Sequence, residues 1–385
     1  MNNFDFYCPT RVVFGKGSIA KLSGLIDKDK KVLMIYGGGS IKKNGVYNQV
    51  KEALKNHNVV EFSGIEPNPT YETCMKAVEI VKKENIDFLL AVGGGSTLDG
   101  TKFIAAAAKY TQGDPYDFVK NDGISVKSAL PLGSVITLPA TGSEMNCGAV
   151  ISKNETQEKF AFHSFFVYPQ FSIIDPETTY SLPIRQVRNG IVDTFVHVME
   201  QYATYDVNSP LQDAWALGLI KTLIQETPKV IENNTDYDAK ANIFWCATCA
   251  LNYWINVGII QDWSTHRIGH ELTALYGLDH GQSLAIIMPR LWSARKEAKA
   301  NKLAKLAREV YGCSETDDLK AADCAIKKTE EFFNSIGMTT KLSDYNINSL
   351  EAATRIKERF EKRGAKLGED LKITPDMVYD ILKNC

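Results

Sequence analysis

The sequence predicts an α/β domain with a parallel sheet over residues 1–180, followed by an all-helical domain over residues 181–385. Three observations predict this organisation. Apolar runs such as 30–36 and 86–92 alternate with helical segments, and both runs end in a glycine-rich turn. Beyond about residue 180, extended runs stop and helical periodicity continues to the C-terminus. A length of 385 residues is also more typical of two hydrophobic cores than of one.

The composition is that of an ordinary globular protein, and it excludes several classes of function. Hydrophobic residues make up 44% and charged residues 23% of the chain, and the net charge is −2. The chain therefore has no basic field suited to nucleic acid or to an anionic membrane. The eight cysteines are too sparse for a disulfide scaffold, and the lone Cys246–Cys249 pair favours buried free thiols over half of a zinc site. Because no signal-peptide pattern and no apolar run of about 20 residues is present, we expect a cytoplasmic protein.

The elements of the α/β domain follow one another in a regular order. Residues 4–14 alternate and are rich in aromatic and β-branched side chains, which predicts an opening strand or hairpin. Ser18 can cap the short helix that follows. The next expected elements are a buried strand over 30–36, a helix around 44–56, a strand over 58–62, a loop at 66–70, a helix through about 84, a buried strand over 86–92, a strand over 134–139 and a strand from 171 to the break at Asp175–Pro176.

Glycine-rich turns, Gly37–Ser40 and Gly93–Ser96, follow two of these strands. Between a strand and a helix, such turns let backbone N–H groups approach a phosphate, and the helix dipole favours its charge. Neither turn matches GxGxxG or a P-loop, so each one alone is also compatible with a common tight turn. Thr137 and the segment Ala140–Glu144 add hydroxyl groups and a glycine that suit ribose or phosphate. A nucleotide site and a pair of plain turns remain the two alternatives.

The histidines of the helical domain are concentrated in two segments. The chain has six histidines, and four of them fall between residues 197 and 280. Asp193 and His197 would share one helix face, as would His266 and His270, and His280 follows the helix-ending Gly277. Three imidazoles and one carboxylate could then converge, a ligand set that suits Fe(II) or Zn(II) better than Ca²⁺ or Mg²⁺.

An ordinary surface or core role is the alternative for each of these histidines. The polar stripe formed by Gly190, Asp193, His197 and Glu200 argues against it, because a solvated stripe would more naturally carry Lys and Glu. The spacing makes a metal site plausible without proving it.

Six motifs carry a resemblance that covers essentially the whole chain. They are GGGSTLDGTK, DPYDF, TLPATGSEMN, DPETTYSLP, NGIVDTFVHVMEQY and HRIGHELTALYGLDHG. In order and spacing they resemble the iron-containing, or group III, alcohol dehydrogenases, and within that family the NADPH-dependent butanol dehydrogenase and aldehyde reductase subgroup. The resemblance implies a dehydroquinate synthase-like architecture, in which an α/β dinucleotide-binding domain precedes an all-α metal-binding domain.

The resemblance also implies the site residues. The metal ligands would be Asp193, His197, His266 and His280. His270 would lie beside the metal without binding it, and we consider it a candidate for relaying a proton or positioning substrate, with mere packing as the alternative. The cofactor-binding residues would be Gly37, Gly38, Gly39, Ser40, Asn68, Gly94, Gly95, Ser96, Asp99, Thr137, Thr141, Ser143 and Lys159, the last being the least securely aligned.

Gly38 is the residue on which the expected cofactor depends. NAD-preferring members of the family tend to carry Asp at this position, which would accept from the ribose 2′-OH and repel a 2′-phosphate. Gly38, Ser40 and Lys42 or Lys43 instead leave room and donors for a phosphate, which favours NADP over NAD. We expect one divalent ion, Fe(II) or Zn(II), and the resemblance implies a homodimer to which residues 4–14 contribute.

The resemblance implies a metal-dependent NADP(H)-linked alcohol dehydrogenase or aldehyde reductase. It would transfer hydride to and from primary alcohols and aldehydes such as butanol and butyraldehyde. The alternatives are an NAD-using polyol dehydrogenase, a lyase of the dehydroquinate synthase type, and a non-catalytic NADP-binding sensor. Trp254, Phe162 and Ile151 are candidates for lining an apolar substrate pocket, with plain core positions as the alternative.

Overall fold

The computed structural model describes residues 1–385 and confirms the predicted fold class. Its contacts group the chain into two compact units, an α/β unit (Tyr7–Pro183 and Asn234–Thr248) and a helical unit (Met1–Phe6, Ile184–Asn233 and Cys249–Cys385). The main change of unit, between Pro183 and Ile184, lies next to the boundary expected at residue 180. The grouping of Met1–Phe6 with the helical unit and of Asn234–Thr248 with the α/β unit was not predicted. The domain limits themselves stay a prediction.

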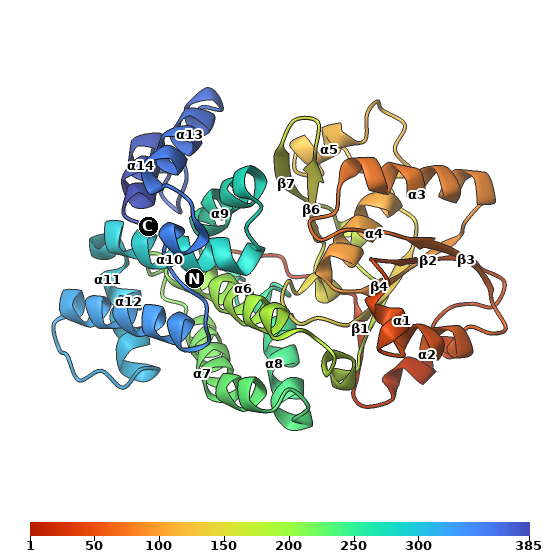
Figure 1. Cartoon of the computed structure of the whole chain (residues 1–385), viewed down its shortest axis with the longest axis horizontal. Coiled ribbons are helices and arrows are strands. Elements are labelled where there is room, and N and C mark those ends of the chain that lie inside the picture. The colour runs from red at the N-terminus through yellow and green to blue at the C-terminus, as the bar shows by residue number, and fades with distance from the viewer. The chain divides into compact units, whose positions relative to one another are not determined.

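One parallel sheet of six strands, in the order β1-β8-β5-β4-β2-β3, forms the centre of the α/β unit (Figure 1). Its strands are β1 (Arg11–Phe14), β2 (Lys31–Tyr36), β3 (Asn58–Ser63), β4 (Phe88–Gly93), β5 (Leu132–Ile136) and β8 (Phe171–Ile174). Every residue of β4 is buried, because this strand lies between β2 and β5 and helices cover both faces of the sheet. This burial explains the continuous apolar runs that predict parallel strands.

The side chains of β2 divide between two hydrophobic cores, one on each face of the sheet. Leu33 and Ile35 pack with α3 (Tyr71–Glu84) and α4 (Gly95–Ala107), whereas Val32 and Met34 pack with α2 (Val46–Ala53) and a 3-10 helix at Ser18–Gly24. The other helices of this unit are α1 (Ser40–Lys43), α5 (Tyr116–Lys120) and most of α8 (Tyr237–Ala250).

Two features of the α/β unit differ from the expectation. The opening strand covers only Arg11–Phe14, because it is an edge strand that pairs with β8 alone and Pro9 has no N–H to donate just before it. An antiparallel hairpin of β6 (Gly148–Lys153) and β7 (Glu158–His163) was not predicted. It forms a separate two-stranded sheet.

The helical unit contains the predicted run of helices. They are α6 (Ile184–Tyr202), α7 (Pro210–Glu232), α9 (Ser264–Tyr276), α10 (His280–Ala294), α11 (Lys296–Glu309), α12 (Asp318–Ser335), α13 (Ser349–Lys362) and α14 (Pro375–Lys383). Helix α6 is buried without interruption from Gly190 to its end, and α10 packs against α6, α9, α12 and α14. None of the helices combines the length and the apolar character that crossing a membrane requires.

Candidate active site

The two predicted glycine turns lie side by side at the carboxyl edge of the parallel sheet. Strands β2 and β4 are hydrogen-bonded neighbours, with Tyr36 opposite Val92, and each leads directly into its turn. After β2 the chain forms β3 on one side of that strand, and it then forms β4 on the other side. The two turns therefore flank the point where the strand order reverses. Open α/β sheets bind their ligands at such switch points.

The surroundings of the two turns differ. A Cβ on Gly95 would collide with the Thr141 side chain, and a Cβ on Gly93 would lie 2.6 Å from Oγ1 of Thr97. The second turn is therefore closely packed, and only glycine fits there. Gly38, in the first turn, faces open space, because nothing lies within 4 Å of an added Cβ. The first turn leaves room for a ligand group beside its backbone.

Asp99 and Ser143, two residues predicted to bind the cofactor, bond to each other. Ser143 Oγ donates to Asp99 Oδ1 at 2.7 Å, and the Val150 N–H donates to Asp99 Oδ2 at 2.9 Å. Lys102, fully buried one turn later on α4, donates to three backbone carbonyls of residues 143–148. Burial raises the pKa of Asp99, and burial lowers the pKa of Lys102 to about 8. These bonds fix the loop that follows β5.

Three further predicted cofactor residues come together from separate segments. The Asn68 N–H donates to Ser96 Oγ at 3.3 Å, and Lys159 Nζ donates to Asn68 Oδ1 at 2.9 Å. Lys159 lies on β7, so the unpredicted hairpin is the element that delivers it. The Thr137 N–H donates to the Gly93 carbonyl at 2.9 Å, which joins the end of β5 to the second glycine turn.

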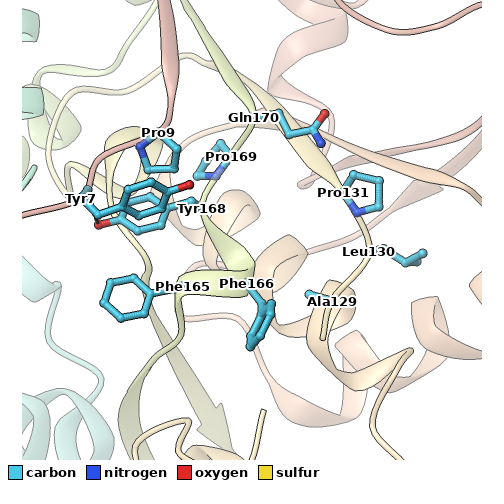
Figure 2. A pocket seen from close by; sticks show the side chains of 10 residues that line it. All are labelled: Tyr7, Pro9, Ala129, Leu130, Pro131, Phe165, Phe166, Tyr168, Pro169 and Gln170. Atoms are coloured by element: carbon cyan, nitrogen blue, oxygen red, sulfur yellow. Dashed lines mark hydrogen bonds between the residues drawn. The ribbon is translucent and has the colours of Figure 1, made fainter. Parts of the chain in front are cut away.

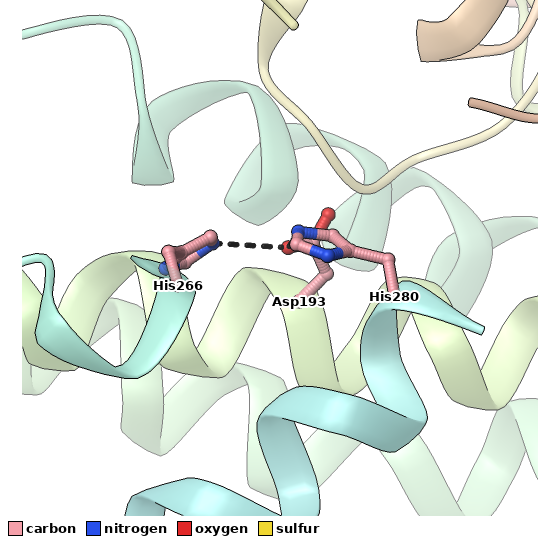
Figure 3. A group of neighbouring side chains, drawn as sticks. All are labelled: Asp193, His266 and His280. Atoms are coloured by element: carbon pink, nitrogen blue, oxygen red, sulfur yellow. Dashed lines mark ion pairs between the residues drawn. The ribbon is translucent and has the colours of Figure 1, made fainter. Parts of the chain in front are cut away.

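The predicted metal ligands meet in the helical unit. Asp193, His266 and His280 each place one ligand atom within 4.8 Å of the others, and they come from α6, α9 and α10 (Figure 3). His197 lies one turn after Asp193 on α6, and its ring stacks on that of His266 with 4.7 Å between centroids. The Nε2 atoms of His197, His266 and His280 lie 3.5, 3.6 and 3.4 Å from the same Asp193 oxygen.

These separations fit a metal ion better than direct hydrogen bonds. Ligands about 2.1 Å from a tetrahedral ion lie about 3.4 Å from one another, since the edge of a tetrahedron is about 1.6 times the bond. Nε2 of His266 is buried and has no hydrogen-bond partner, and the same holds for Oδ1 of Asp193. Buried polar atoms are rarely left in this state unless they face an ion or a water molecule.

The charges around the cluster lead to the same conclusion. Burial pushes the pKa of Asp193 upward, but the imidazoles of His197 and His280 outweigh it and hold the pKa well below its usual value. Burial would lower the pKa of His266, but the carboxylates of Glu200 and Asp193 outweigh it and raise the pKa to about 9. The cluster therefore attracts positive charge at the point that its nitrogens share, and a divalent cation would supply that charge.

Comparison with known proteins decides the family. Residues 9–176 match the model described as "Iron-containing alcohol dehydrogenase", and residues 188–385 match "Fe-containing alcohol dehydrogenase family, C-terminal". The chain belongs to the iron-containing alcohol dehydrogenase family. It is 51% identical over 378 residues to the NADPH-dependent aldehyde reductase YqhD of Escherichia coli (strain K12), with 98% of each chain covered.

Further relatives place the chain within this family. The crystal structure of E. coli YqhD superposes with a TM-score of 0.98 at 50% identity, covering 100% of this chain and 98% of that one. The NADP-dependent alcohol dehydrogenase 3 of Entamoeba histolytica is 44% identical, with 96% of each chain covered. The NADH-dependent butanol dehydrogenase A of Thermotoga maritima has a TM-score of 0.93 at 37% identity, covering 100% of this chain and 98% of that one.

Glu200 is a residue of this alcohol dehydrogenase to which the sequence alone assigns no role. Its carboxylate accepts from Nδ1 of His266, from the Thr265 N–H at 2.5 Å and from the His266 N–H at 3.2 Å. A carboxylate bound to Nδ1 leaves the Nε2 lone pair free for an ion and fixes the ring orientation. Its place in the polar stripe of α6, one turn after His197, was the available signal.

The approach of α10 to α6 sets the position of His280. Asp279 caps α10 and accepts two bonds from Arg185 and one, at 2.7 Å, from Asn189 Nδ2. Gly281 lies directly over α6, since an added Cβ would be 2.7 Å from both Cα and O of Asn189. The absence of a side chain at Gly281 therefore allows the helix contact that brings His280 to Asp193.

Other residues singled out in the sequence occupy different positions. The His270 ring lies 5.4 Å from that of His280 and 6.2 Å from that of His266, and it is not one of the three residues that form the tight group. The suggestion that Phe162 and Ile151 line a pocket is wrong, because both are completely buried in the core of the α/β unit. The Trp254 ring lies 6.5 Å from that of Trp215, tilted by 38° to it, and both side chains are exposed.

Proposed function

We propose that this chain is a metal-dependent, NADP(H)-linked alcohol dehydrogenase and aldehyde reductase for primary alcohols and aldehydes such as butanol and butyraldehyde. The convergence of three imidazole nitrogens on one buried carboxylate oxygen carries the proposal, since it supplies a ligand set for a divalent ion. Membership of the family and the names of the E. coli and Entamoeba relatives support the reaction class.

We assign Asp193, His197, His266 and His280 as the ligands of one Fe(II) or Zn(II) ion. When bound, the ion would polarise the substrate oxygen while the nicotinamide exchanges hydride with the adjoining carbon. Asp193 supplies the only negative charge among the four ligands. Glu200 holds His266 so that Nε2 faces the shared point, and its bonds to the backbone at residues 265 and 266 hold that carboxylate in turn.

The preference for NADP(H) rests on the first glycine turn, because the family holds relatives named for either cofactor, such as the 51% identical NADPH-dependent aldehyde reductase and the 37% identical NADH-dependent butanol dehydrogenase. Open space at Gly38 leaves room for a 2′-phosphate. The Lys42 ammonium lies over the rings of Tyr36 and Tyr47, 5.2 and 5.0 Å from their centroids, which fixes a cation on the short helix that begins at Ser40. The carboxylate of Glu61 nearby is already bound by Lys51 at 2.9 Å.

Replacing Gly38 by aspartate should shift the cofactor preference toward NADH. The new side chain meets no neighbour, so the substitution adds a carboxylate without steric conflict. That carboxylate would repel a 2′-phosphate and accept from a 2′-OH, and we expect the ratio of kcat/KM for NADPH to that for NADH to fall at least about tenfold, or about 1.4 kcal/mol. Gly24→Asp, where an added Cβ also meets nothing, is the control. If the ratio of kcat/KM for NADPH to that for NADH is unchanged in Gly38→Asp, this explanation of the cofactor preference is wrong.

We propose that His270 relays the substrate proton or positions the substrate. Its ring lies beside those of two ligands without joining the tight group. In His270→Gln, we expect kcat to fall roughly 10²-fold or more and the pH dependence of kcat to flatten, because positioned acid–base groups contribute about 10²–10⁴-fold. The affinity of the metal-free protein for Zn(II) should stay at the wild-type value. If rate and pH profile both stay as in the wild type, His270 only packs beside the site.

The reaction class is tested by following NADPH oxidation with butyraldehyde on anaerobically purified protein. NADH serves as the parallel cofactor, and chelator-treated protein serves as the control. Turnover that depends on metal and prefers NADPH is the expected result. Turnover that prefers NADH would support the proposed reaction and contradict the cofactor preference that we infer from Gly38. No turnover with either cofactor in metal-replete protein would contradict the proposal and favour a lyase or a sensor.

We further propose a homodimer formed through the edge of the sheet at β1. This strand has one free side, and the chain just before it contributes to a hollow of about 400 Å³ with an aromatic lining (Figure 2). Tyr7, Phe165 and Phe166 are 58%, 71% and 53% exposed there. Free strand edges and exposed apolar patches are common sites of association. A monomeric mass in sedimentation equilibrium would contradict this proposal.

The cytoplasmic location of the protein stays a prediction.

A further inference from the structure

A buried ionic cluster lies in the helical unit, outside the group of metal ligands. Lys299, on α11, is 1% exposed, and its ammonium donates to three acceptors. These are the Ala203 carbonyl at 2.6 Å, Asp262 Oδ2 at 2.7 Å and Glu369 Oε1 at 2.9 Å. All three N–H donors of the ammonium are therefore used.

Two of these acceptors lie at the ends of the helices that carry metal ligands. Ala203 directly follows α6, which carries Asp193 and His197, and its N–H closes the last turn of that helix on the Met199 carbonyl at 2.8 Å. Asp262 lies two residues before α9, which carries His266. The Lys299 ammonium thus joins the end of one ligand helix to the start of another.

A continuous chain of hydrogen bonds leads from Asp262 to His266. Asp262 Oδ1 accepts from the hydroxyl of Ser264 and, at 3.0 Å, from its N–H, which fixes the first turn of α9. The Asp262 N–H donates to the Glu200 carbonyl at 2.9 Å. The Glu200 carboxylate in turn binds the backbone at Thr265 and Nδ1 of His266. Asp262 therefore ties the start of α9 to α6, since its carboxylate binds Ser264 and its N–H binds Glu200.

We propose that Lys299 is a positioning residue for the metal site, an inference that rests on the proposed function. It sets the separation of α6 and α9 through Ala203 and Asp262, and this separation fixes Nε2 of His266 3.6 Å from Asp193. Without the ammonium, Asp262 is a buried carboxylate with no cation, and a carboxylate in that state draws in water or turns away from its partners. Either change loosens the start of α9.

The test is Co(II) binding to the metal-free full-length protein, read from the visible d–d absorption and from a chelator competition. In Lys299→Met, we expect the Co(II) affinity to fall about 10- to 100-fold, as for other outer partners of metal ligands, and the absorption band to change shape. Lys299→Arg should recover part of both, because a guanidinium can still bridge the two helix ends. The shape of the band reports ligand geometry, which a merely destabilised but folded protein would keep.

Lys302→Met is the matched control. Lys302 lies one turn later on α11 and is 4% exposed, but its carboxylate partner is Asp213 on α7. This variant should lose comparable stability and keep the wild-type band and affinity. The double variant Lys299→Met with Asp262→Asn removes this ion pair together and leaves only the Glu369 carboxyl, whose pKa burial already raises, so it keeps the test informative if the single variant does not fold. It should fold and still bind Co(II) weakly.

The outcomes separate this inference from the proposed function. If the wild type binds Co(II) and the Lys299 variants keep its affinity and band, the positioning role is wrong while the metal site stands. The positioning role is equally wrong if Lys302→Met weakens binding as much as Lys299→Met. If the wild type itself binds no Co(II), the metal site is wrong and the role of Lys299 falls with it.

Discussion

Replacing His280 by alanine should remove the metal and the activity together. Its Nε2 lies 3.4 Å from the Asp193 oxygen on which two other imidazoles converge, and α10 contributes no other predicted ligand to the cluster. Loss of an outer partner alone costs about 10- to 100-fold in metal affinity, so we expect loss of a ligand to cost more than about 100-fold. The rate should fall by roughly 10³-fold or more, because polarisation of the substrate oxygen by an ion contributes several kcal/mol.

The measurement is the metal content of the purified protein together with the rate of NADPH-dependent reduction of butyraldehyde. His163→Ala is the control, since His163 is exposed on β7 and pairs with Asp122. That variant should keep its metal. The fold of His280→Ala should survive, because Asp279 and Gln282 still form the capping box that starts α10. A variant that keeps both its metal and its rate would show that the ligand assignment is wrong.

Gly281→Ala should weaken the same site without touching any ligand. In an ordinary helix this change stabilises the protein by up to about 1 kcal/mol, because alanine has the higher helix propensity. At Gly281 the substitution should instead destabilise the protein, because the new Cβ would lie 2.7 Å from Cα and O of Asn189, which are backbone atoms of α6 and cannot give way. We expect a loss of about 1–3 kcal/mol in stability. As α10 moves off α6, His280 leaves Asp193, and metal affinity should fall at least about tenfold.

Gly218→Ala is the matched control, because Gly218 lies within α7 and an added Cβ there meets nothing within 4 Å. It should be neutral or slightly stabilising. The two variants are compared by thermal unfolding of the metal-free protein and by Zn(II) affinity. If Gly281→Ala unfolds at the wild-type temperature and binds Zn(II) as tightly, close contact of the two helices at Asn189 is not what places His280.

Much of the fold could be predicted because the strongest signals are local. The run Lys31–Tyr36 is apolar on both sides of the strand, since Leu33 and Val32 enter different cores, and a strand of this kind must be covered on both faces. The hairpin of β6 and β7 gave no such signal, because only Ala149, Ile151 and Phe162 among its residues are buried and its sheet has just two strands. The length of β1 depends on its single partner strand, which local sequence does not reveal.

The site residues also divide into those that local sequence indicates and those that only the tertiary structure reveals. Helical spacing relates Asp193 to His197, and the glycine turns follow directly from the strands before them, so these positions were accessible from sequence. The roles of Lys102 and Lys299 were not accessible, and for Glu200 the polar stripe of α6 was the one signal, because a lysine or glutamate in a helix is normally a solvated residue and only the tertiary structure buries it. Their partners lie 37 to 96 residues away along the chain, from Lys299 with Asp262 to Lys299 with Ala203. No spacing rule connects residues that far apart.

The segment Asn234–Thr248 has a consequence for the order in which the protein folds during synthesis. It belongs to the α/β unit but is made only after α6 and α7. Within that unit, Asn234 Nδ2 donates to the carbonyls of Tyr180 and Leu182, and Thr248 donates to the buried carboxylate of Glu144 at 2.5 Å. A nascent chain that ends near Pro183 therefore lacks the hydroxyl that Glu144 needs. The α/β unit therefore stays incomplete while about fifty residues of the helical unit are translated. A chaperone would have this interval in which to bind the incomplete unit.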